Sequence, residues 1–317
     1  MAGVKRTLAV DLGGIALSTP LVAASGTFGT GREGGLLDTR RLGAAVSRSI
    51  TLAPRKGAPS PRVAETASGL LWSVGLQNPG IDAFLADELP RLTRTGIPLF
   101  VSIAGSSLEE YVRLASVLQD VQGIAGIEVY LRGEGEAQEG EPFLSSAEHV
   151  VGVVGAVSRL SRLPVVAKLP VSLADLVESA RGCVRAGAHG LTIDGSAPGM
   201  AIDTARLRPE VGAISGFLSG PAVRPFTVRA VFEVARILPE VPILAAGGVW
   251  TGNDAVELLL AGAWAVEMGT ALLVDPSAAT AAADGILGYL KHKGLASPAD
   301  IRGRVRIPEP GTGEEAG

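Results

Sequence analysis

The chain contains a single cysteine, Cys183, among its 317 residues. One thiol cannot form an internal disulfide, and it excludes a thiolate metal cluster built within this chain. A chain without disulfides is typical of a reducing compartment, so a cytoplasmic location is the default expectation. The three histidines, His149, His189 and His292, show no metal-ligand spacing, and we expect no metal site.

Excess charge and long apolar runs are scarce as well. The formal net charge is −4, which gives no electrostatic reason to expect nucleic acid or an anionic membrane as a partner. The most apolar window, residues 255–274, contains Glu257 and Glu267 and two element breaks. We interpret it as a core helix followed by a core strand, and we expect neither a membrane span nor a signal peptide.

Short apolar runs alternate with helical patterns along most of the chain. Two of these helical patterns are Ser107–Val121 and Pro225–Leu238. Eight runs are nearly continuous in apolar residues, as strands buried on both faces should be. This alternation predicts an α/β fold, a (β/α)₈ TIM barrel of parallel strands. The eight predicted strands are Leu21–Ser25, Ala44–Ile50, Leu99–Ala104, Gly126–Leu131, Pro164–Leu169, Gly190–Ile193, Pro242–Ala246 and Ala265–Gly269.

The two ends of the chain have different patterns. Thr7–Val10 and Gly14–Leu17 predict a small N-terminal β-hairpin that covers the bottom of the barrel. The last residues are polar and rich in glycine and proline, which predicts a disordered tail over residues 303–317. We therefore expect one domain, a single barrel over residues 1–302.

Two linked motifs near the N-terminus point to a family. The first reads TLAPRKGAPSPRVAET over residues 51–66, and the second reads GLQNPG over residues 75–80. Together they resemble the class 1 dihydroorotate dehydrogenases, and class 1B most closely. Members of this family are FMN-dependent barrel enzymes of pyrimidine biosynthesis. The resemblance, which extends from about residue 21 to about residue 270, implies a flavin-dependent oxidoreductase that acts on CH–CH donors.

Glycine-containing loops follow the last two predicted strands and precede the helical pattern at Pro225. Ligands of such barrels sit at the C-terminal strand ends, where glycine lets backbone N–H groups approach a phosphate. The resemblance places the FMN phosphate there, although the same glycines could serve only as turns. The residues expected to hold the phosphate are Ser219, Gly220, Gly247, Gly248, Gly269 and Thr270.

The resemblance also assigns residues to the flavin ring. Lys168 matches a fifth-strand lysine of the family that lies near N1 and O2, where a cation stabilises the reduced, anionic ring. The alternative is a strand-end lysine that extends to solvent. A second-strand lysine of the family is replaced by Arg48, and a third-strand asparagine by Ser102. The expected ring contacts are Ala24, Ser25, Gly26, Arg48, Ser102 and Lys168.

The residues that read orotate in the family are replaced. Trp72 precedes GLQNPG, Gly195 ends the sixth strand, and a fourth-strand motif of the form N-x-S-C-P-N reads YLRGEG over residues 130–135. Carboxylates or arginines in that stretch could serve as a base or clamp an anion, although a solvated loop is the alternative. The expected substrate contacts are Arg48, Trp72, Arg132, Asp194 and Ser196.

The catalytic base of the family is replaced as well. The cysteine of the fourth-strand motif falls on Gly133, which has no side chain, and Cys183 lies within a helix. Replacement candidates for catalysis are Tyr130 and Glu134, with Lys168 as the cation beside the ring. We therefore expect dihydroorotate oxidation to be very slow or absent, because positioned acid–base groups contribute about 10² to 10⁴ in rate.

Three functions remain open. The first is an FMN-dependent oxidoreductase with an altered substrate site that takes a small, anionic molecule. The second is a non-catalytic relative that binds FMN or another phosphate and acts as a regulatory or partner subunit. The third is a genuine dihydroorotate dehydrogenase with an unusual base. The resemblance also implies a homodimer and a partner subunit that is an iron–sulfur flavoprotein.

Overall fold

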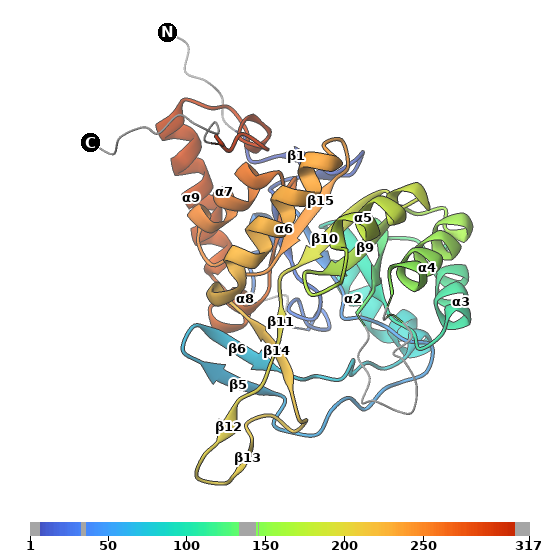
Figure 1. Ribbon diagram of the computed structural model, residues 1–317. Helices are drawn as coiled ribbons and strands as arrows, with labels where there is room; N and C mark the ends of the chain where they lie inside the picture. Colours follow the sequence, from blue (N-terminus) through green and yellow to red (C-terminus); the bar gives the residue numbers. More distant parts are fainter. Residues whose placement is uncertain (1–6, 33–35, 133–143, 145, 308–317) are drawn as a thin grey trace.

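The computed structural model describes residues 7–32, 36–132, 144 and 146–307. Eight parallel strands close into a barrel, and helices cover its outer face (Figure 1). The (β/α)₈ barrel expected from the alternating pattern is therefore confirmed. Around the barrel the strands are β3 Leu21–Ala23, β4 Ala44–Val46, β7 Leu99–Ile103, β8 Gly126–Tyr130, β9 Val165–Pro170, β10 Gly190–Asp194, β15 Ile243–Ala246 and β16 Ala265–Met268.

The outer helices begin at residues that suit helix starts. Ser107 and Ser146 accept hydrogen bonds from backbone N–H groups in the first turns of α3 and α4, and Thr251 forms a capping box at α7. The helices are α1 Ile81–Ala83, α2 Leu89–Thr93, α3 Leu108–Leu118, α4 Ala147–Leu160, α5 Leu176–Arg185, α6 Arg224–Ile237, α7 Gly252–Ala261, α8 Thr270–Val274 and α9 Ala278–Lys293. The 3₁₀ turns are η2 Thr39–Arg41, η4 Pro221–Val223 and η5 Pro298–Asp300, and η3 Phe84–Glu88 is a π-helical segment.

The barrel interior has an apolar layer at the N-terminal strand ends. Alternate residues of each strand face inward, and neighbouring strands contribute to different layers, so one layer takes its side chains from every second strand. The N-terminal hairpin of β1 (Val10–Asp11) and β2 (Ala16–Leu17) packs against this layer, as predicted, although its strands are shorter than expected. The buried cluster that contains the layer and its cover comprises Val22, Ala44, Val46, Phe100, Val166, Leu244 and Ala265 with Leu12 and Leu17.

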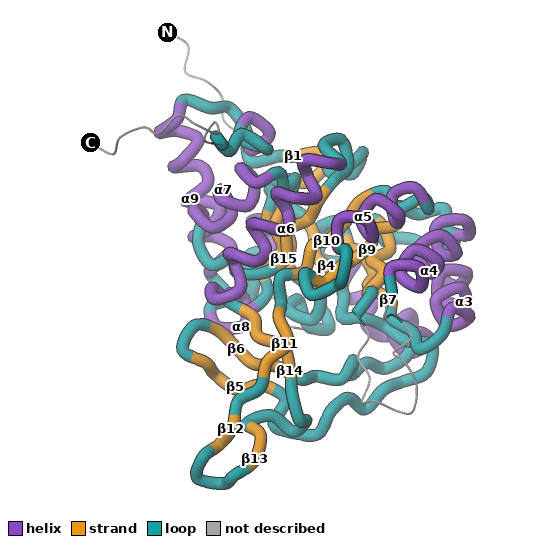
Figure 2. Tube along the Cα trace, viewed as in Figure 1, coloured by secondary structure: helices purple, strands orange, loops and turns teal. Residues whose placement is uncertain are grey.

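A second, antiparallel sheet lies at the other end of the barrel. Its strand order is β11, β14, β6, β5, and a two-stranded hairpin extends beyond it. Figure 1 and Figure 2 both show these strands beyond the barrel, at the end opposite β1. The sheet therefore lies on the side of the C-terminal strand ends. Its strands are β5 Val63–Thr66, β6 Gly69–Trp72, β11 Ala197–Gly199 and β14 Gly216–Ser219, with β12 Ile202–Asp203 and β13 Arg208–Pro209 in the hairpin.

The two N-terminal motifs fold against each other through Asn78. This buried side chain accepts a hydrogen bond from the backbone N–H of Thr51 at 3.2 Å and donates one to Thr51 Oγ1 at 2.8 Å. It also accepts from the backbone N–H of Gly80 at 2.8 Å. The asparagine of the second motif thus holds the first motif in place, which is a structural task.

The domain boundary at residue 302 stays a prediction, and residues 308–317 of the expected tail lie outside the described residues. In the part of the chain that the structure describes, none of the helices combines the length and the apolar character that a bilayer crossing requires.

Candidate functional site

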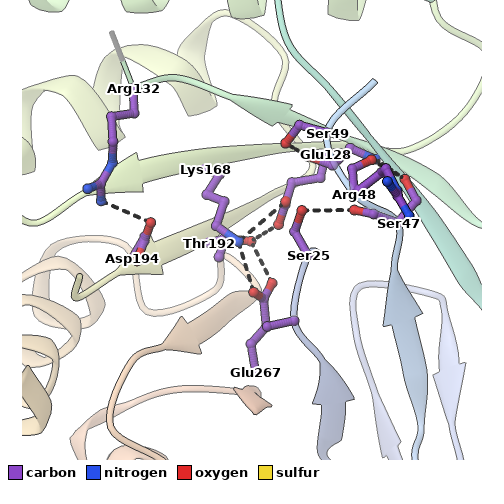
Figure 3. Close-up of polar contacts among 12 residues, drawn as sticks. Ser25, Ser47, Arg48, Ser49, Glu128, Arg132, Lys168, Thr192, Asp194 and Glu267 are labelled. Atoms are coloured by element: carbon purple, nitrogen blue, oxygen red, sulfur yellow. Dashed lines mark hydrogen bonds and ion pairs between the residues drawn. The ribbon is translucent and has the colours of Figure 1, made fainter. Parts of the chain in front are cut away.

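A polar layer of side chains lies in the barrel interior, one layer closer to the C-terminal strand ends than the apolar layer. The Nζ atom of Lys168 lies 2.9 Å from Glu267 Oε2 and 3.4 Å from Glu128 Oε1. Thr192 donates a hydrogen bond to Glu128 Oε2 at 3.0 Å. Figure 3 shows Lys168 pointing between the two carboxyl groups. The structure therefore places this lysine in a buried ion-pair cluster, and it does not extend to solvent.

Burial and mutual attraction shift the acid–base properties of this cluster. Burial raises the pKa of Glu267 to about 8, since the attraction of Lys168 opposes this rise only in part and Glu128 adds to it. Burial alone would lower the pKa of Lys168, but the carboxylates of Glu128, Glu267 and Asp194 more than offset that effect, so its pKa lies above the usual value. The lysine is therefore charged at neutral pH, whereas burial favours the protonated form of Glu267.

A second buried cation, Arg132, follows the end of β8. Its Nη2 atom donates to Asp194 Oδ2 at 3.0 Å, to Ser196 Oγ at 2.9 Å and to the Ser196 carbonyl at 3.2 Å. Its guanidinium carbon lies 4.2 Å from the centre of the Phe217 ring, which in turn packs against Trp72 with ring centres 5.1 Å apart. Four of the five residues expected to contact substrate therefore come together, with Phe217 as an addition.

Two nitrogen atoms of Arg132 have no hydrogen-bond acceptor among the described residues. The residue is only 7% exposed, yet its Nε and Nη1 atoms have no hydrogen-bond partner within the described chain. A buried donor without a partner costs about 1–3 kcal/mol, and more when it is charged. Because a guanidinium presents its N–H groups in a fixed planar fork, the free donors on these two nitrogen atoms suit an acceptor on an anionic ligand.

Asp194 is the counter-ion of Arg132. Burial would raise the pKa of Asp194, but the charges of Arg132 and Lys168 and the hydrogen bonds from Ser196 hold it below its usual value. The carboxylate is therefore ionised at neutral pH and weakly basic. This makes Asp194 a positioning residue for the guanidinium and a poor general base.

Arg48 lies apart from Arg132. Its Nε atom is 3.6 Å from Glu88 Oε2, in the π-helical turn η3, and 27% of its side chain is exposed. Figure 3 shows the two arginines on opposite sides of Lys168. The structure therefore does not bring them together as a joint clamp for one small anion.

The ends of β3, β4 and β7 are tied to one another by serine hydroxyls. Ser25 Oγ donates to the Ser47 carbonyl at 2.8 Å, and the Ser102 N–H donates to Ser47 Oγ at 3.0 Å. Ser102 Oγ also lies 2.9 Å from Ser49 Oγ. Gly26 has φ 82, and a side chain added there would meet nothing within 4 Å, so the backbone of this turn borders open space.

Three loops meet where the phosphate is expected. Thr270, the first residue of α8, donates a hydrogen bond from Oγ1 to Ser219 Oγ at 2.8 Å. Ser219 ends β14, and Gly220 with φ 102 turns the chain from this strand into η4 and α6. The loop after β14 and the start of α8 are thus joined by one hydroxyl pair.

The loop after β15 completes this arrangement. Gly247 and Gly248 have φ 128 and 86, and a side chain on Gly248 would collide with the backbone of Arg224 at the start of α6. None of the hydrogen bonds within the described residues uses the backbone N–H of Gly247, Gly248 or Gly269 as its donor. Free backbone donors beside helix starts are what a phosphate group requires, so these residues fit one.

The structure explains one of the replaced positions. A side chain added to Gly195 would overlap with Thr227 Oγ1, so this backbone has no room for an asparagine unless Thr227 moves. Gly133 and the proposed base Glu134 lie outside the described residues. Tyr130, the other candidate base, is 7% exposed, and its backbone carbonyl accepts a hydrogen bond from Tyr111 Oη at 2.7 Å.

Two reactive side chains, Cys183 and His189, lie away from this end. Cys183 is buried in α5, and burial raises the pKa of its thiol to about 12. His189 precedes β10, and its Nδ1 atom accepts a hydrogen bond from the Val165 N–H at 3.1 Å. The described residues contain no cluster of side chains suited to a metal ion.

Four residues of the site were not recognised from the sequence: Glu128, Thr192, Phe217 and Glu267. The two glutamates did carry a signal, because GIEVY and AVEM each place one acidic residue inside an otherwise apolar strand. A buried charge needs a partner, so each glutamate could have been matched with Lys168. Thr192 and Phe217 carried no such signal.

Comparison with known proteins gives a consistent result. A family model described as dihydroorotate dehydrogenase matches residues 7–290. A protein of Geotalea daltonii described as dihydroorotate dehydrogenase B (NAD(+)), catalytic subunit, is 40% identical over 304 residues, which cover 96% of this chain and 99% of the relative. One of the same description from Desulforudis audaxviator is 44% identical over 292 residues, which cover 92% and 95%.

The fold has a counterpart among solved structures. The crystal structure of DHODH in complex with ferulenol from Eimeria tenella superposes with a TM-score of 0.77 at 20% sequence identity. The match covers 94% of this chain and 88% of that chain. At this level of identity the likeness concerns the fold alone.

Proposed function

Because the chain belongs to the dihydroorotate dehydrogenase family, we propose that it is an FMN-dependent oxidoreductase that oxidises a small anionic substrate at the C-terminal end of its barrel. The observation that carries this proposal is the pair of unpartnered N–H donors on buried Arg132, which lie at the same barrel end as the glycine loops. A buried, charged donor pair is costly to keep free unless a ligand uses it.

FMN is the proposed cofactor, and the loops after β14, β15 and β16 are its proposed phosphate site. The free backbone N–H groups of Gly247, Gly248 and Gly269 would bind the phosphate, and Lys168 would lie beneath the ring. Bound FMN would supply a hydride acceptor. The open space at Gly26 suits a flat ring against the end of β3.

Arg132 is the proposed reader of the substrate. Asp194 and Ser196 fix its Nη2 atom, and Phe217 supports one face of the guanidinium. The free Nε and Nη1 donors are thus held in a defined place and need not be ordered when the ligand arrives. A carboxylate or a ring carbonyl oxygen is the acceptor that these donors suit best.

The substrate to be tried first is dihydroorotate itself. The similarity to curated enzymes over 92–96% of this chain favours this second, more specific candidate. It requires an unusual base, for which Tyr130 and Glu134 are the candidates, since Asp194 is held as a weakly basic carboxylate. We propose that the reaction is slow for this reason: proton abstraction by the unusual base limits its rate, and binding of the anion does not.

The electron acceptor and the assembly are proposals that rest on the relatives. Both curated relatives carry NAD(+) and "catalytic subunit" in their descriptions. These words support NAD⁺ as the acceptor and a second subunit. We propose, from the family resemblance, that this subunit is an iron–sulfur flavoprotein and that the chain forms a homodimer, and, from the lack of disulfides, that it is cytoplasmic. Reduction of NAD⁺ by dihydroorotate only when such a subunit is added would support this assignment.

The absorption spectrum of the purified protein tests the proposal at its first step. We expect flavin bands, release of FMN on denaturation, and bleaching of these bands by dihydroorotate under anaerobic conditions. Orotate should perturb the spectrum of the oxidised protein. A colourless protein that takes up no FMN would contradict the proposal and favour the non-catalytic reading, whereas bound FMN that dihydroorotate cannot bleach would point to a different anionic substrate.

A further inference from the structure

The polar layer of the barrel contains one ammonium but two carboxyl groups. Lys168 contacts both Glu128 and Glu267, and the two glutamates are each only 1% exposed. If both carboxyl groups were ionised, one buried negative charge would lack a counter-ion. Such a charge costs several kcal/mol, and a buried group avoids this cost by keeping a proton.

No other cation of the described chain lies against these carboxyl groups. The strands on either side of Glu267 are β3 and β15, whose residues Leu21–Ala23 and Ile243–Ala246 are all apolar. The charged groups across the barrel are Glu128 and Lys168, then Asp194, which is already paired with Arg132 on the mouth side. Within the described residues Lys168 is the one cation paired with these carboxyl groups, so a proton on one of them would balance the charge of the layer.

Thr192 connects the two carboxyl groups. Its hydroxyl donates to Glu128 Oε2 at 3.0 Å, and its oxygen lies 3.5 Å from Glu267 Oε1. A hydroxyl has one hydrogen and two lone pairs, so Thr192 can donate to an ionised carboxylate while it accepts from a protonated one. The chain Glu267, Thr192, Glu128 is thus arranged to hold one proton.

We infer that Glu128 and Glu267 share a single proton through Thr192, and that this proton determines how much of the positive charge of Lys168 acts on a flavin ring bound on the mouth side of the layer. The inference rests on the proposed FMN site for its second half only. It makes Glu267 a positioning residue that acts through Lys168.

The expected behaviour follows from the charges. With the proton in place, Lys168 and Glu128 form a neutral pair and Glu267 is uncharged. Loss of the proton adds a negative charge beside the ammonium and weakens its attraction for negative charge on the ring. The raised pKa of Glu267, about 8, places this change at mildly alkaline pH.

The first half of the inference can be tested without flavin. Infrared spectra of the flavin-free protein should contain the C=O stretch of a protonated carboxyl group at neutral pH, and this band should vanish as the pH rises through about 8. Labelling of glutamate with ¹³C should shift the band. If no such band exists between about pH 6 and pH 9, where ordinary carboxyl groups are ionised, the proton is absent and the inference is wrong.

Two matched variants separate a shared proton from a proton that belongs to one residue alone. Glu267→Gln keeps a neutral side chain in place and should remove the band. Glu128→Gln leaves Glu267 as the sole partner of Lys168, so Glu267 should ionise and the band should again be lost at neutral pH. A band that persists in Glu128→Gln would show that Glu267 is protonated independently, which contradicts sharing.

The second half needs the flavin-loaded protein and its midpoint potential. Wild type and Glu267→Gln should agree at about pH 6, and wild type should fall below the variant above about pH 8. Potentials that stay parallel at every pH would contradict the link to Lys168. Failure to bind FMN would instead refute the proposed function, while the infrared band would still decide whether the proton is shared.

Discussion

The barrel holds two buried cations that differ in how well they are balanced. Lys168 lies in the polar layer with two carboxyl groups and a threonine within reach. Arg132 lies at the mouth with one carboxylate, and two of its nitrogen atoms lack acceptors within the described residues. The first cation has more negative partners than it needs, and the second has fewer acceptors than donors.

This difference separates two tasks that a charged side chain can perform. The charge of Lys168 is matched inside the protein, so it can act on a ligand only as a field and as part of a proton-holding cluster. The charge of Arg132 is matched by Asp194, but its hydrogen-bonding capacity is incomplete and suits direct contact. The presence of a buried ion pair does not show which task its cation performs. The number of acceptors around the cation, compared with its donors, does show it.

The largest effect is expected at the balanced cation. Lys168→Met leaves the buried carboxyl groups without a counter-ion, and the free energy of unfolding at neutral pH should fall by about 3–5 kcal/mol. Urea unfolding measures it. The control Arg206→Met removes an exposed ion pair with Asp203, 3.1 Å long, which should cost less than about 1 kcal/mol. Equal losses in the two variants would show that the layer does not depend on Lys168.

The second-largest effect is expected in the pH dependence of stability, which should differ between the polar layer around Lys168 and the mouth around Arg132. The folded-state pKa of Glu267, about 8, exceeds its unfolded value, so this group stabilises the protein fully at low pH and loses that contribution as pH rises through about 8. The loss should amount to a few kcal/mol between about pH 5 and pH 9. Asp194 acts in the opposite sense, because its lowered pKa gives stability that is lost only in acid.

The difference in unfolding free energy between wild type and Glu267→Gln separates the pH dependence that Glu267 causes from the titration of other groups. Urea unfolding at several pH values should show that this difference in free energy changes with pH below about 8 and is constant above it. A difference that stays constant over the whole range would mean that Glu267 titrates at its ordinary pKa, and the layer would then contain an unmatched charge.

An intermediate effect is expected at the phosphate loops. Gly269→Ala adds a methyl group that meets Ala24 and Thr27 only at 3.6 and 3.8 Å, so the fold should persist while the methyl group crowds the free N–H. FMN affinity, measured by fluorescence titration, should fall by about tenfold, as for one lost hydrogen bond to a phosphate. Gly288→Ala, in open space on α9, is the control and should retain full affinity.

The smallest effect is expected at the aromatic support of Arg132. Phe217→Leu removes a ring that lies 4.2 Å from the guanidinium carbon, and such contacts contribute about 0.5–2 kcal/mol. Orotate affinity should fall a few-fold, as measured by titration of the flavin spectrum. Phe232→Leu removes the corresponding ring beside Arg236, 5.5 Å away on the outer face, and should leave orotate binding unchanged. An equal change in both variants would remove Phe217 from the site.

The sequence predicted those parts of the molecule that depend on local patterns. Eight apolar runs mark the barrel strands, and the glycine loops mark the proposed phosphate side, because burial and turn chemistry act within a few residues. The sheet over the mouth was missed, since β6 pairs with β14 across about 145 residues and its short strands show no clear alternation. Phe217 reaches Arg132 only through that pairing.

The polar layer was missed for a different reason. Glu128, Thr192 and Glu267 come from three strands, and only closure of the barrel in its observed register places them around Lys168. Composition of a single strand shows a charge but not its partner. The same holds for Gly195, whose lack of a side chain is explained by Thr227 from α6, a residue that no local pattern connects with it.

Binding of orotate to the flavin-loaded protein tests the central claim most directly, because the free donors of Arg132 are proposed to meet the ligand. Arg132→Lys keeps the charge but loses the planar set of donors. Orotate affinity should fall by about 10- to 100-fold, as expected for lost charge-assisted hydrogen bonds, while Glu267→Gln binds as wild type does at about pH 6. A folded, FMN-loaded Arg132→Lys that binds orotate as tightly as wild type would contradict this account.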